Sequence, residues 1–247
     1  VPPFPSDESI SLGAACHIKY RTLKHPWRPI PLAKQRGNFG HRRRPPIRRE
    51  IKRLFPGAHI LKPGNIERYT AKKLFEGQVV GWFQDQSESG PRALGQRSIL
   101  ASPFKRGIKD RLNNKVKFRE SFRPYSAACH WEKAHIYFDV AKGFDSPFMS
   151  FAPQVRHEYQ SLLKEVSHID GSSRLQTVRR SQNQRFHDLL SEFEKCSGLP
   201  CLLNTSMNVM GEPIVETVID AARFFKSAPI EAMVMGEYFI SRSTPRR

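Results

Sequence analysis

The stretch Ser87-Glu-Ser-Gly-Pro-Arg-Ala-Leu-Gly-Gln-Arg-Ser-Ile-Leu100 follows an apolar run, Val79 to Phe83, that is typical of a buried strand. It carries Arg92 and Arg97 at the end of a strand, where open α/β sheets place their ligands. Gly90 allows backbone angles closed to other residues, and the proline after it fixes the turn. A guanidinium on such a constrained loop can grip a phosphate or carboxylate with two hydrogen bonds. The stretch predicts an α/β sheet with an anion site, although solvated arginines on a surface turn remain an alternative for this motif alone.

The charge of the chain is strongly positive and uneven. A formal charge of +18 over 247 residues favours anionic partners, such as nucleotides, phosphorylated metabolites or nucleic acid. Thirteen basic residues and one acid, Glu50, lie between His17 and Leu54, in a proline-rich segment without apolar periodicity. We expect residues 17–50 to be a linker or arm. Whether this segment binds nucleic acid or is only solvated stays open at this stage.

Several classes of protein are disfavoured by the composition. The four cysteines form no Cys-x-x-Cys pair and no zinc spacing, which favours a reduced chain in the cytoplasm. No run approaches the roughly 18 apolar residues of a membrane span, and we see no signal sequence. His130 and His135 are five residues apart, whereas two ligands on one helix need a spacing of three or four. We therefore expect a soluble, cytoplasmic chain without a metal site.

Caps, glycines and apolar periodicity predict an alternation of helices and strands from Ile51 onward. A run of small residues at 11–16 also suits a helix. Helices are predicted at 65–77, 107–115, 183–198 and 217–227, and strands at 79–83, 98–103, 199–203 and 232–240, with a further strand ending at Val178.

A second basic segment is Val116-Lys-Phe-Arg-Glu-Ser-Phe-Arg-Pro124. If it is a strand, its alternation places Lys117, Arg119 and Arg123 on one face. Three like charges on one face repel one another unless an anion lies between them. A basic exposed strand edge is the alternative, because charged edges prevent aggregation. Arg174, which opens the strand that ends at Val178, is a further candidate anion ligand.

Small hydrogen-bonding residues, Asn204, Ser206 and Asn208, alternate just beyond the strand at 199–203. Such positions commonly cradle a nucleotide or phosphate, although an Asn/Ser-rich turn that bonds its own backbone has the same composition. The sequence contains no helix-opening glycine motif for dinucleotides, no P-loop and no nucleophile elbow. These residue types suit catalysis by positioning and charge stabilisation.

Four ordered segments resemble the NodU/CmcH carbamoyltransferases, and specifically their C-terminal, YrdC-like domain, over about residues 51 to 240. They are Gly90-Pro-Arg-Ala-Leu-Gly95 with Arg97-Ser-Ile-Leu100, Lys117-Phe-Arg119 with Phe122-Arg-Pro124, Asp170-Gly171 with Arg174-Leu-Gln-Thr-Val178, and Leu202-Leu-Asn-Thr-Ser-Met-Asn208 with Gly211-Glu-Pro-Ile-Val215. The resemblance implies an α/β fold with a YrdC-like open, twisted, mixed sheet and flanking helices in residues 51–247. Residues 1–16 resemble a remnant of the N-terminal, actin-like ATPase-type domain, and 17–50 would be the linker.

The resemblance also implies a function. Such domains bind ATP, with Mg2+, and carbamoyl phosphate, and form carbamoyladenylate for O-carbamoylation of a sugar or secondary-metabolite hydroxyl. Full transfer needs the N-terminal transferase domain, which also holds iron; Asp7 would be an isolated ligand from it. The catalytic residues expected from the resemblance are Arg92, Lys117, Arg123 and Ser206, and those expected to bind the nucleotide are Arg97, Arg119, Arg174, Asn204 and Asn208.

Two alternatives remain at this stage. The chain could be a basic nucleic-acid-binding module of YrdC-like fold, or an inactive remnant whose fold persists. Asp85 and Gln86 stand where Gly and Arg are common in the family, which removes one cation from the site. The acceptor is not specified by these residues, because acceptor recognition would lie in the N-terminal domain.

Overall fold

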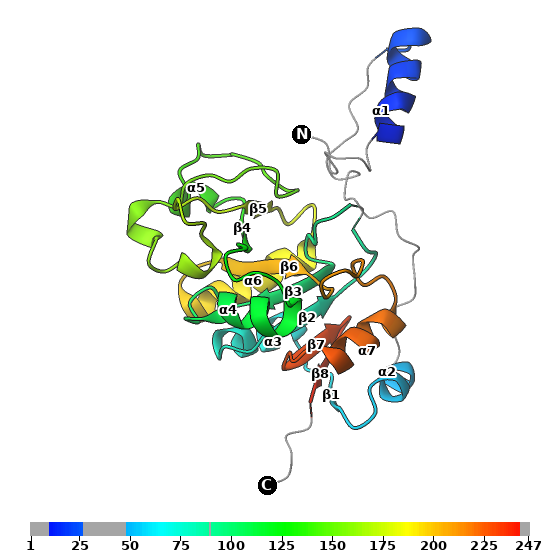
Figure 1. Ribbon diagram of the computed structural model, residues 1–247, viewed down its shortest axis with the longest axis vertical. Helices are drawn as coiled ribbons and strands as arrows, with labels where there is room; N and C mark the ends of the chain where they lie inside the picture. The colour runs from blue at the N-terminus through cyan, green and yellow to red at the C-terminus, as the bar shows by residue number, and fades with distance from the viewer. Residues whose placement is uncertain (1–9, 27–47, 89, 243–247) are drawn as a thin grey trace.

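A mixed eight-stranded sheet forms the body of the protein in the computed structural model, which describes residues 10–26, 48–88 and 90–242 (Figure 1). The strand order is β1-β8-β7-β2-β3-β6-β4-β5. The strands are β1 His59–Leu61, β2 Val80–Phe83, β3 Arg97–Ala101, β4 Ser126–His130, β5 Leu175–Val178, β6 Cys201–Ser206, β7 Ala232–Met235 and β8 Tyr238–Ser241. β2 pairs with β7, and β4 with β5, in parallel, whereas the other pairs are antiparallel. The predicted open, mixed α/β sheet is confirmed.

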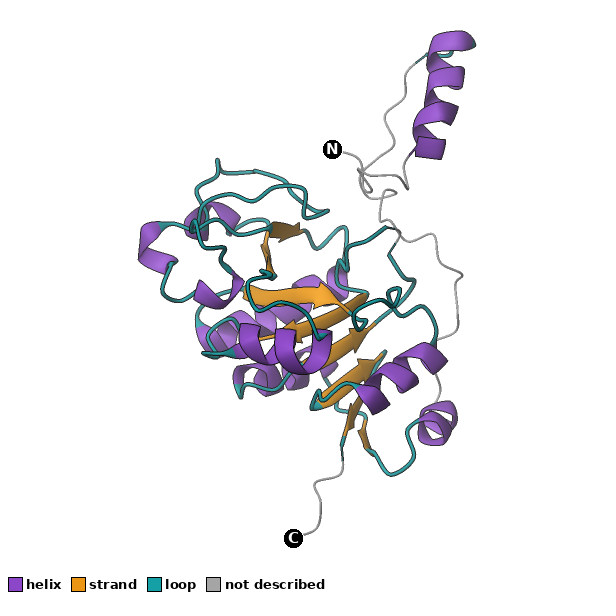
Figure 2. Cartoon of the chain, viewed as in Figure 1, coloured by secondary structure: helices purple, strands orange, loops and turns teal. Residues whose placement is uncertain are grey.

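Helices cover both faces of the sheet (Figure 2). The α-helices are α1 Ile10–His17, α2 Arg48–Leu54, α3 Ile66–Phe75, α4 Ile108–Leu112, α5 Ala134–Tyr137, α6 Gln184–Ser197 and α7 Val218–Ser227. The π-helices are η2 Ile18–Thr22 and η4 Asn113–Lys117, and the 3-10 helices are η5 His157–Tyr159 and η6 Lys164–Val166. The long connection from β4 to β5 consists mostly of loops and short helices.

The central strands are buried on both faces, which explains their continuous apolar runs. In β2, Val80 and Trp82 face a core shared with α3 and α6. Phe83 faces the second core, which holds residues of α2, α4 and α7. The sheet is therefore sandwiched between two helical layers, and polar side chains near the strand ends remain available for a site.

Side-chain caps set the helix starts where the sequence predicts them. Asn65 accepts a hydrogen bond from the Arg68 N–H, and Asn183 accepts one from the Phe186 N–H. Thr217 begins α7 with a capping box to Asp220. The predicted helices at 65–77, 183–198 and 217–227 are confirmed.

Three local predictions differ from the structure. The predicted strand over 116–124 is wrong: η4 ends at Lys117, and Phe118 then turns the chain with a φ of 47°. The predicted strand at 232–240 is a hairpin, β7 and β8, which turns at Gly236 with a φ of 57°. The predicted strand at 199–203 extends through Ser206. In the first case, the cations alternate as they would on one face of a strand, but the Lys117 side chain is buried against Asn208, whereas Arg123 is exposed and pairs with Glu120.

The segments outside the sheet domain are only partly described. Residues 18–22 of the predicted linker form η2, and α2 begins at Arg48, so the predicted boundary at Ile51 lies inside a helix. Asp7 and residues 27–47 lie outside the described residues. Within the described ranges, every helix is too short or too polar to cross a membrane.

Candidate functional site

Lys117 is the centre of the site. Its side chain is buried, with 4% exposed, and it lies at the end of η4 against the end of β6. The Lys117 Nζ donates to the Ser206 carbonyl, and to the carbonyl and Oδ1 of Asn208 at 3.0 Å and 2.7 Å. Burial, and secondly the charge of Arg119, lower the pKa of Lys117 to about 7. The ammonium therefore lies among neutral oxygens, where a bound anion would stabilise its charged form.

Ser206 and Asn208 are held in place by the end of the sheet. Ser206 pairs with Ser98 of β3, and its Oγ donates to Asn208 Oδ1 at 2.7 Å. The Asn208 Nδ2 donates to the Glu212 carbonyl at 2.8 Å, which fixes the following turn. The structure thus brings together the predicted residues Lys117, Ser206 and Asn208, although Lys117 precedes Ser206 by 89 residues and Asn208 by 91 residues in the sequence.

Three arginines extend this positive region. The pKa of Arg174 is lowered by burial and then by the charges of Arg92 and Arg119, so both of these arginines lie near Arg174. We call Arg92, Lys117, Arg119 and Arg174 the cationic cluster. Among the described residues, none of its four members forms an ion pair with a carboxylate. Four cations without counter-ions make this end of the sheet suitable for a multiply charged anion.

Asn113 shapes the turn that separates the two basic residues of the Lys-x-Arg pair. Its buried Oδ1 accepts from Arg119 Nε at 2.8 Å and from the Tyr125 hydroxyl at 2.7 Å. Phe118, between Lys117 and Arg119, is 56% exposed and has left-handed backbone angles, which are unfavourable for a bulky residue. The strained turn sends Lys117 inward and lays Arg119 over the Tyr125 ring, 4.7 Å from its centroid.

Glu88 organises the loop that carries Arg92. Its Oε1 accepts from the backbone N–H groups of Leu94 at 2.6 Å, Gln96 at 2.7 Å and Arg97 at 3.2 Å. Burial raises the pKa of Glu88, and the three N–H bonds oppose this shift. One carboxylate thus fills a nest of backbone donors and fixes the loop from inside.

The two glycines of the loop meet different needs. Gly90 has a φ of 91°, as the sequence predicts. Gly95 has a φ of 100°, and a Cβ there would lie 2.4 Å from Cδ1 of Phe186 on α6. A side chain at Gly95 would therefore push the loop away from the helix.

Arg97 and Asn204 lie inside the scaffold. The Arg97 guanidinium donates to the carbonyls of Gln84 at 2.5 Å, Gln96 at 3.1 Å and Asp85 at 3.1 Å, and stacks on Phe83. The Asn204 Nδ2 donates to the Ala93 carbonyl at 3.1 Å and to Gln176 Oε1 at 2.8 Å. Both side chains thus brace the loop that carries Arg92, Asn204 together with Gln176 of β5, and their nucleotide contacts stay a prediction.

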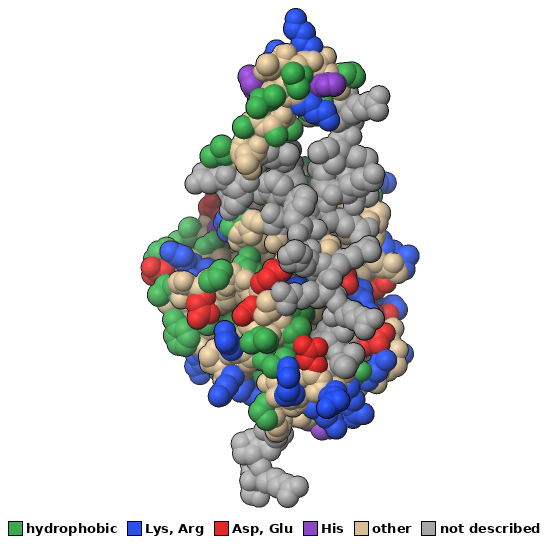
Figure 3. Space-filling model, turned by 90° about the vertical axis from the view of Figure 1, so that its right-hand side faces the viewer, with side chains coloured by type: hydrophobic (Ala, Val, Ile, Leu, Met, Phe, Trp, Pro, Cys, Tyr) green, Lys and Arg blue, Asp and Glu red, His purple; other side chains and the backbone are tan. Residues whose placement is uncertain are grey.

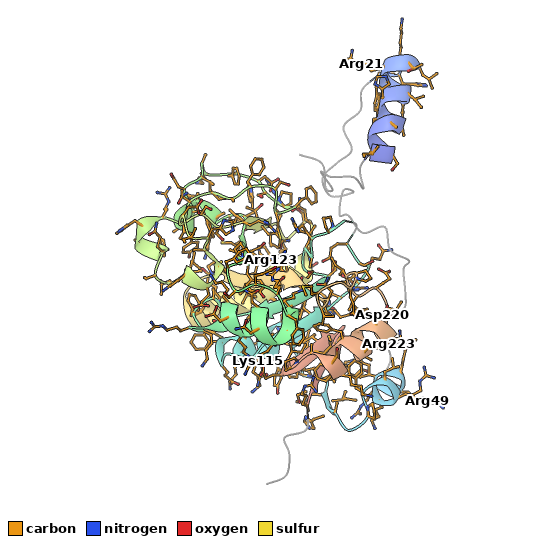
Figure 4. The ribbon with its side chains drawn as sticks, in the orientation of Figure 1. Arg21, Arg49, Lys115, Arg123, Asp220 and Arg223 are labelled. Carbon is orange, nitrogen blue, oxygen red and sulfur yellow. The ribbon has the colours of Figure 1, made fainter. Side chains whose placement is uncertain are left out.

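Arg123 also departs from its predicted place. It is exposed, and its Nε pairs with Glu120 Oε2 at 2.9 Å (Figure 4). The turn at Phe118 removes the strand that would have placed Arg123 on one face with Lys117 and Arg119. The structure does not bring Arg123 into the cationic cluster.

One group among the described residues has donor atoms close enough for a metal ion: His130, Glu132 and His187, within 4.8 Å of one another. The His130 and His187 rings are stacked at 4.1 Å with planes 15° apart, so their lone pairs do not converge on one point. The His130 Nε2 also bonds the His187 carbonyl at 3.0 Å. His130 is the last residue of β4, whereas Ser126, which pairs with Asn204 near the cationic cluster, is the first. The histidine group therefore lies at the other end of the strand, separate from the cationic cluster. We assign no metal to it.

Comparison with known protein families assigns most of this chain to one of them. The profile of the family described as "Carbamoyltransferase C-terminus" matches residues 71–242, which is well over half of the chain. The chain belongs to the carbamoyltransferase C-terminal family. The match contains the whole cationic cluster together with Glu88, Ser206 and Asn208, so the family domain and the candidate site coincide.

Carbamoyltransferases and nodulation proteins are among the relatives of this family member. Nodulation protein NolNO of Sinorhizobium fredii is 43% identical over 76% of this chain and 28% of its own length. The 3'-hydroxymethylcephem-O-carbamoyltransferase of Streptomyces clavuligerus is 40% identical over 68% and 32%. Nodulation protein U of Rhizobium tropici is 36% identical over 85% and 34%. The chain thus spans about a third of the length of these relatives.

A solved structure also shows some likeness, namely that of full-length HypF in the phosphate- and nucleotide-bound form. The TM-score is 0.45 and the identity 15%, over 74% of this chain and 22% of that one.

Three residues of this carbamoyltransferase domain were missed by sequence reasoning: Glu88, Asn113 and Gln176. Gln176 donates from Nε2 to the Leu94 carbonyl at 3.0 Å and so supports Asn204 from β5. A carboxylate two residues before Gly90 was the available signal for Glu88, because a basic loop rich in backbone donors needs an acceptor.

Proposed function

We propose that this domain binds ATP and carbamoyl phosphate at the cationic cluster and forms carbamoyladenylate, the activated donor for O-carbamoylation of a hydroxyl group. The observation that carries the proposal is the group of four cations that have no carboxylate partner among the described residues, with Lys117 bonded to the Ser206 and Asn208 oxygens. Membership of the carbamoyltransferase family supports the class of reaction. Fixed cations of this kind stabilise the charge that develops on phosphoryl oxygens.

The chemistry assigns a task to each part of the site. In the adenylating step, a carbamate oxygen attacks the α-phosphorus of ATP, and the bond to the β-phosphate breaks to release pyrophosphate. Where carbamoyl phosphate is the donor, water first releases its phosphate to give carbamate. Arg92 and Arg174 would bind the phosphates, and Lys117 would stabilise the negative charge at the α-phosphate. Each of these groups acts by position and charge, and none forms a covalent bond to the substrate.

Magnesium would accompany ATP. Within the described residues, the carboxylate on the cluster loop is that of Glu88, and its Oε1 is already bound by three N–H groups. The described residues therefore offer no open pair of carboxylates at this position, and the ion would be held mainly by the ATP phosphates and water.

The acceptor step would lie outside this domain. Longer relatives, of which this chain matches about a third, include the 3'-hydroxymethylcephem-O-carbamoyltransferase of Streptomyces clavuligerus. We infer that this domain supplies carbamoyladenylate to a partner domain or polypeptide, which recognises the hydroxyl. The chemical class of the acceptor is then an alcohol of a sugar or a secondary metabolite.

Pyrophosphate release from ATP tests the proposal. We expect release by the purified chain to depend on carbamoyl phosphate, and Arg92→Ala and Lys117→Ala each to lower it by about two orders of magnitude. Lys142→Ala is the matched control, because Lys142 is an exposed lysine of the β4–β5 connection. The proposal fails if the chain neither binds ATP nor releases pyrophosphate, or if the control loses as much activity as the cluster variants.

A further inference from the structure

A cavity of about 910 Å³ opens at the end of the sheet opposite the cationic cluster. It is lined by Gln78, which precedes β2, and by Pro229 to Glu231, which precede β7. These two strands run in parallel, so the cavity lies at their N-terminal ends. The Arg92 loop follows the C-terminal end of β2. The cavity is therefore separate from the proposed carbamoyladenylate site.

Positive side chains converge on this cavity from five segments of the chain. They are Lys73, Arg111, Lys115, Lys226 and Arg242. Among the described residues of the lining, the one carboxylate is that of Glu231, and it already accepts from the Val79 N–H at 2.8 Å and from Arg111 at 2.5 Å. Glu231 thus neutralises Arg111, and Lys73 pairs with Glu76 at 2.8 Å, which leaves Lys115, Lys226 and Arg242 as the cations of the lining without a carboxylate partner among the described residues.

Two of these cations, Lys115 and Lys226, are exposed and have no ion-pair partner in the described part of the chain. Lys115 lies on η4, below Arg123 in the view of Figure 4. Both are free to reorient toward a ligand in the cavity.

Arg242 is fixed in place. Its guanidinium donates to the carbonyls of Phe225, Ala228 at 2.6 Å and Ile230 at 3.0 Å, and lies 4.6 Å from the centroid of the Phe225 ring. These partners are neutral, so the positive charge persists at the C-terminal end of α7. A fixed guanidinium beside two mobile lysines is a suitable arrangement for binding a multiply charged anion.

The positive surface continues beyond the cavity. A neighbouring pocket of about 560 Å³ shares Lys226 and Arg242 with it and adds Arg53 from α2. α2 also exposes Arg48, Arg49 and Lys52. Lysine and arginine side chains gather at the lower end of the face that carries α2 and α7 (Figure 3). A positively charged hollow of nucleotide size suits an anionic ligand.

We propose that the cavity between α3, η4 and the end of α7 is a second anion site, which takes a ligand bearing several phosphate groups. The shared chemistry is phosphate, from either a small polyphosphate or the backbone of a nucleic acid. The cavity itself would hold two or three phosphates, and the adjoining surface of α2 would extend the contact to a longer ligand. The site does not depend on the proposed adenylating activity.

The test uses the full chain with the cationic cluster disabled by Arg92→Ala and Lys117→Met, so that binding there does not contribute. Tripolyphosphate is titrated by calorimetry, and a fluorescein-labelled 12-nucleotide single strand by anisotropy, both at 0.1 M salt. In this background, Lys115→Glu with Lys226→Glu should raise the Kd by about tenfold or more. The matched control, Lys142→Glu with Lys164→Glu, has the same net charge change on exposed lysines outside the cavity and should change the Kd less than about twofold.

The outcomes separate the possibilities. Saturable tripolyphosphate binding that the cavity variant loses indicates a small polyphosphate. Binding of the oligonucleotide alone, with a steep salt dependence, indicates a nucleic acid. Equal weakening by both double variants would show diffuse attraction and overturn the proposal, as would the absence of any binding in the background chain. If the charge-reversed variant does not fold, the Lys115→Gln and Lys226→Gln pair replaces it.

Discussion

Nucleotide affinity should depend on pH through Lys117. Burial lowers the pKa of Lys117 to about 7 in the ligand-free site. The charged fraction is then about nine-tenths at pH 6 and about one-tenth at pH 8. A ligand that binds only the ammonium form has its apparent affinity reduced by that fraction. The contribution of Lys117 should therefore fall about tenfold, or ~1.4 kcal/mol, as the pH rises from 6 to 8.

The variant Lys117→Met isolates this contribution, because it keeps the length of the side chain and removes the charge. A lost charge-assisted hydrogen bond costs about 2 kcal/mol, or roughly 30-fold in affinity. We expect wild type to bind ATP about 30-fold more tightly than Lys117→Met at pH 6, and about threefold more tightly at pH 8. Calorimetric titration at both pH values gives the ratio, in which the titration of ATP itself cancels.

Lys142→Met is the control, since an exposed lysine should leave the affinity and its pH dependence unchanged. A ratio between wild type and Lys117→Met that stays constant from pH 6 to pH 8 would refute the reasoning. It would mean either that the Lys117 ammonium does not contact the nucleotide or that its pKa lies outside this interval.

Three further predictions concern stability. Glu88→Ala leaves three loop N–H groups without their acceptor and should lower the free energy of unfolding in urea by about 3 kcal/mol. Glu88→Gln keeps an acceptor oxygen and should cost about 1 kcal/mol, so equal losses would contradict this role. Arg97→Lys loses a fork that bonds several carbonyls and should cost about 3 kcal/mol by the same assay, whereas a neutral result would argue against its scaffold role. Phe118→Gly relieves a left-handed backbone at an exposed residue and should raise stability by roughly 0.5–1 kcal/mol, and a lower melting temperature would disagree.

The sequence predicted the layers of the fold because local signals coincide with them. Val80 and Trp82 lie in an uninterrupted apolar run, and Asn65 and Asn183 cap helices where their side chains predict a start. Ser206 and Asn208 were predicted because polar residues that follow buried strands rarely serve the core, whereas Lys117 was predicted from an alternation of cations that is not a strand in the structure. These features depend on residues close together in the chain.

The rest depended on contacts that no local pattern contains. Alternating cations after Val116 suggested a strand, but Asn113 holds the turn at Phe118 by bonds across six to ten residues. Arg97 was predicted to bind the nucleotide. Its bonds to the loop carbonyls could not be predicted, because composition does not show whether a guanidinium will meet carbonyls or a phosphate. Glu88, by contrast, was not predicted to have a role, although it lies in the stretch from Ser87 to Leu100. Its role is seen in the structure, where three backbone N–H groups donate to its carboxylate.

The position of β2 in the sheet has a consequence for how the protein forms. β2 lies between β3, which follows it closely, and β7, whose residue Ala232 pairs with Val80 about 150 residues earlier. Closing so long a loop is slow, since its entropy is lost before the strand pairing compensates. On the ribosome, β2 must wait with one edge unpaired until β7 has been synthesised. We expect slow, late folding and dependence on chaperones during that interval.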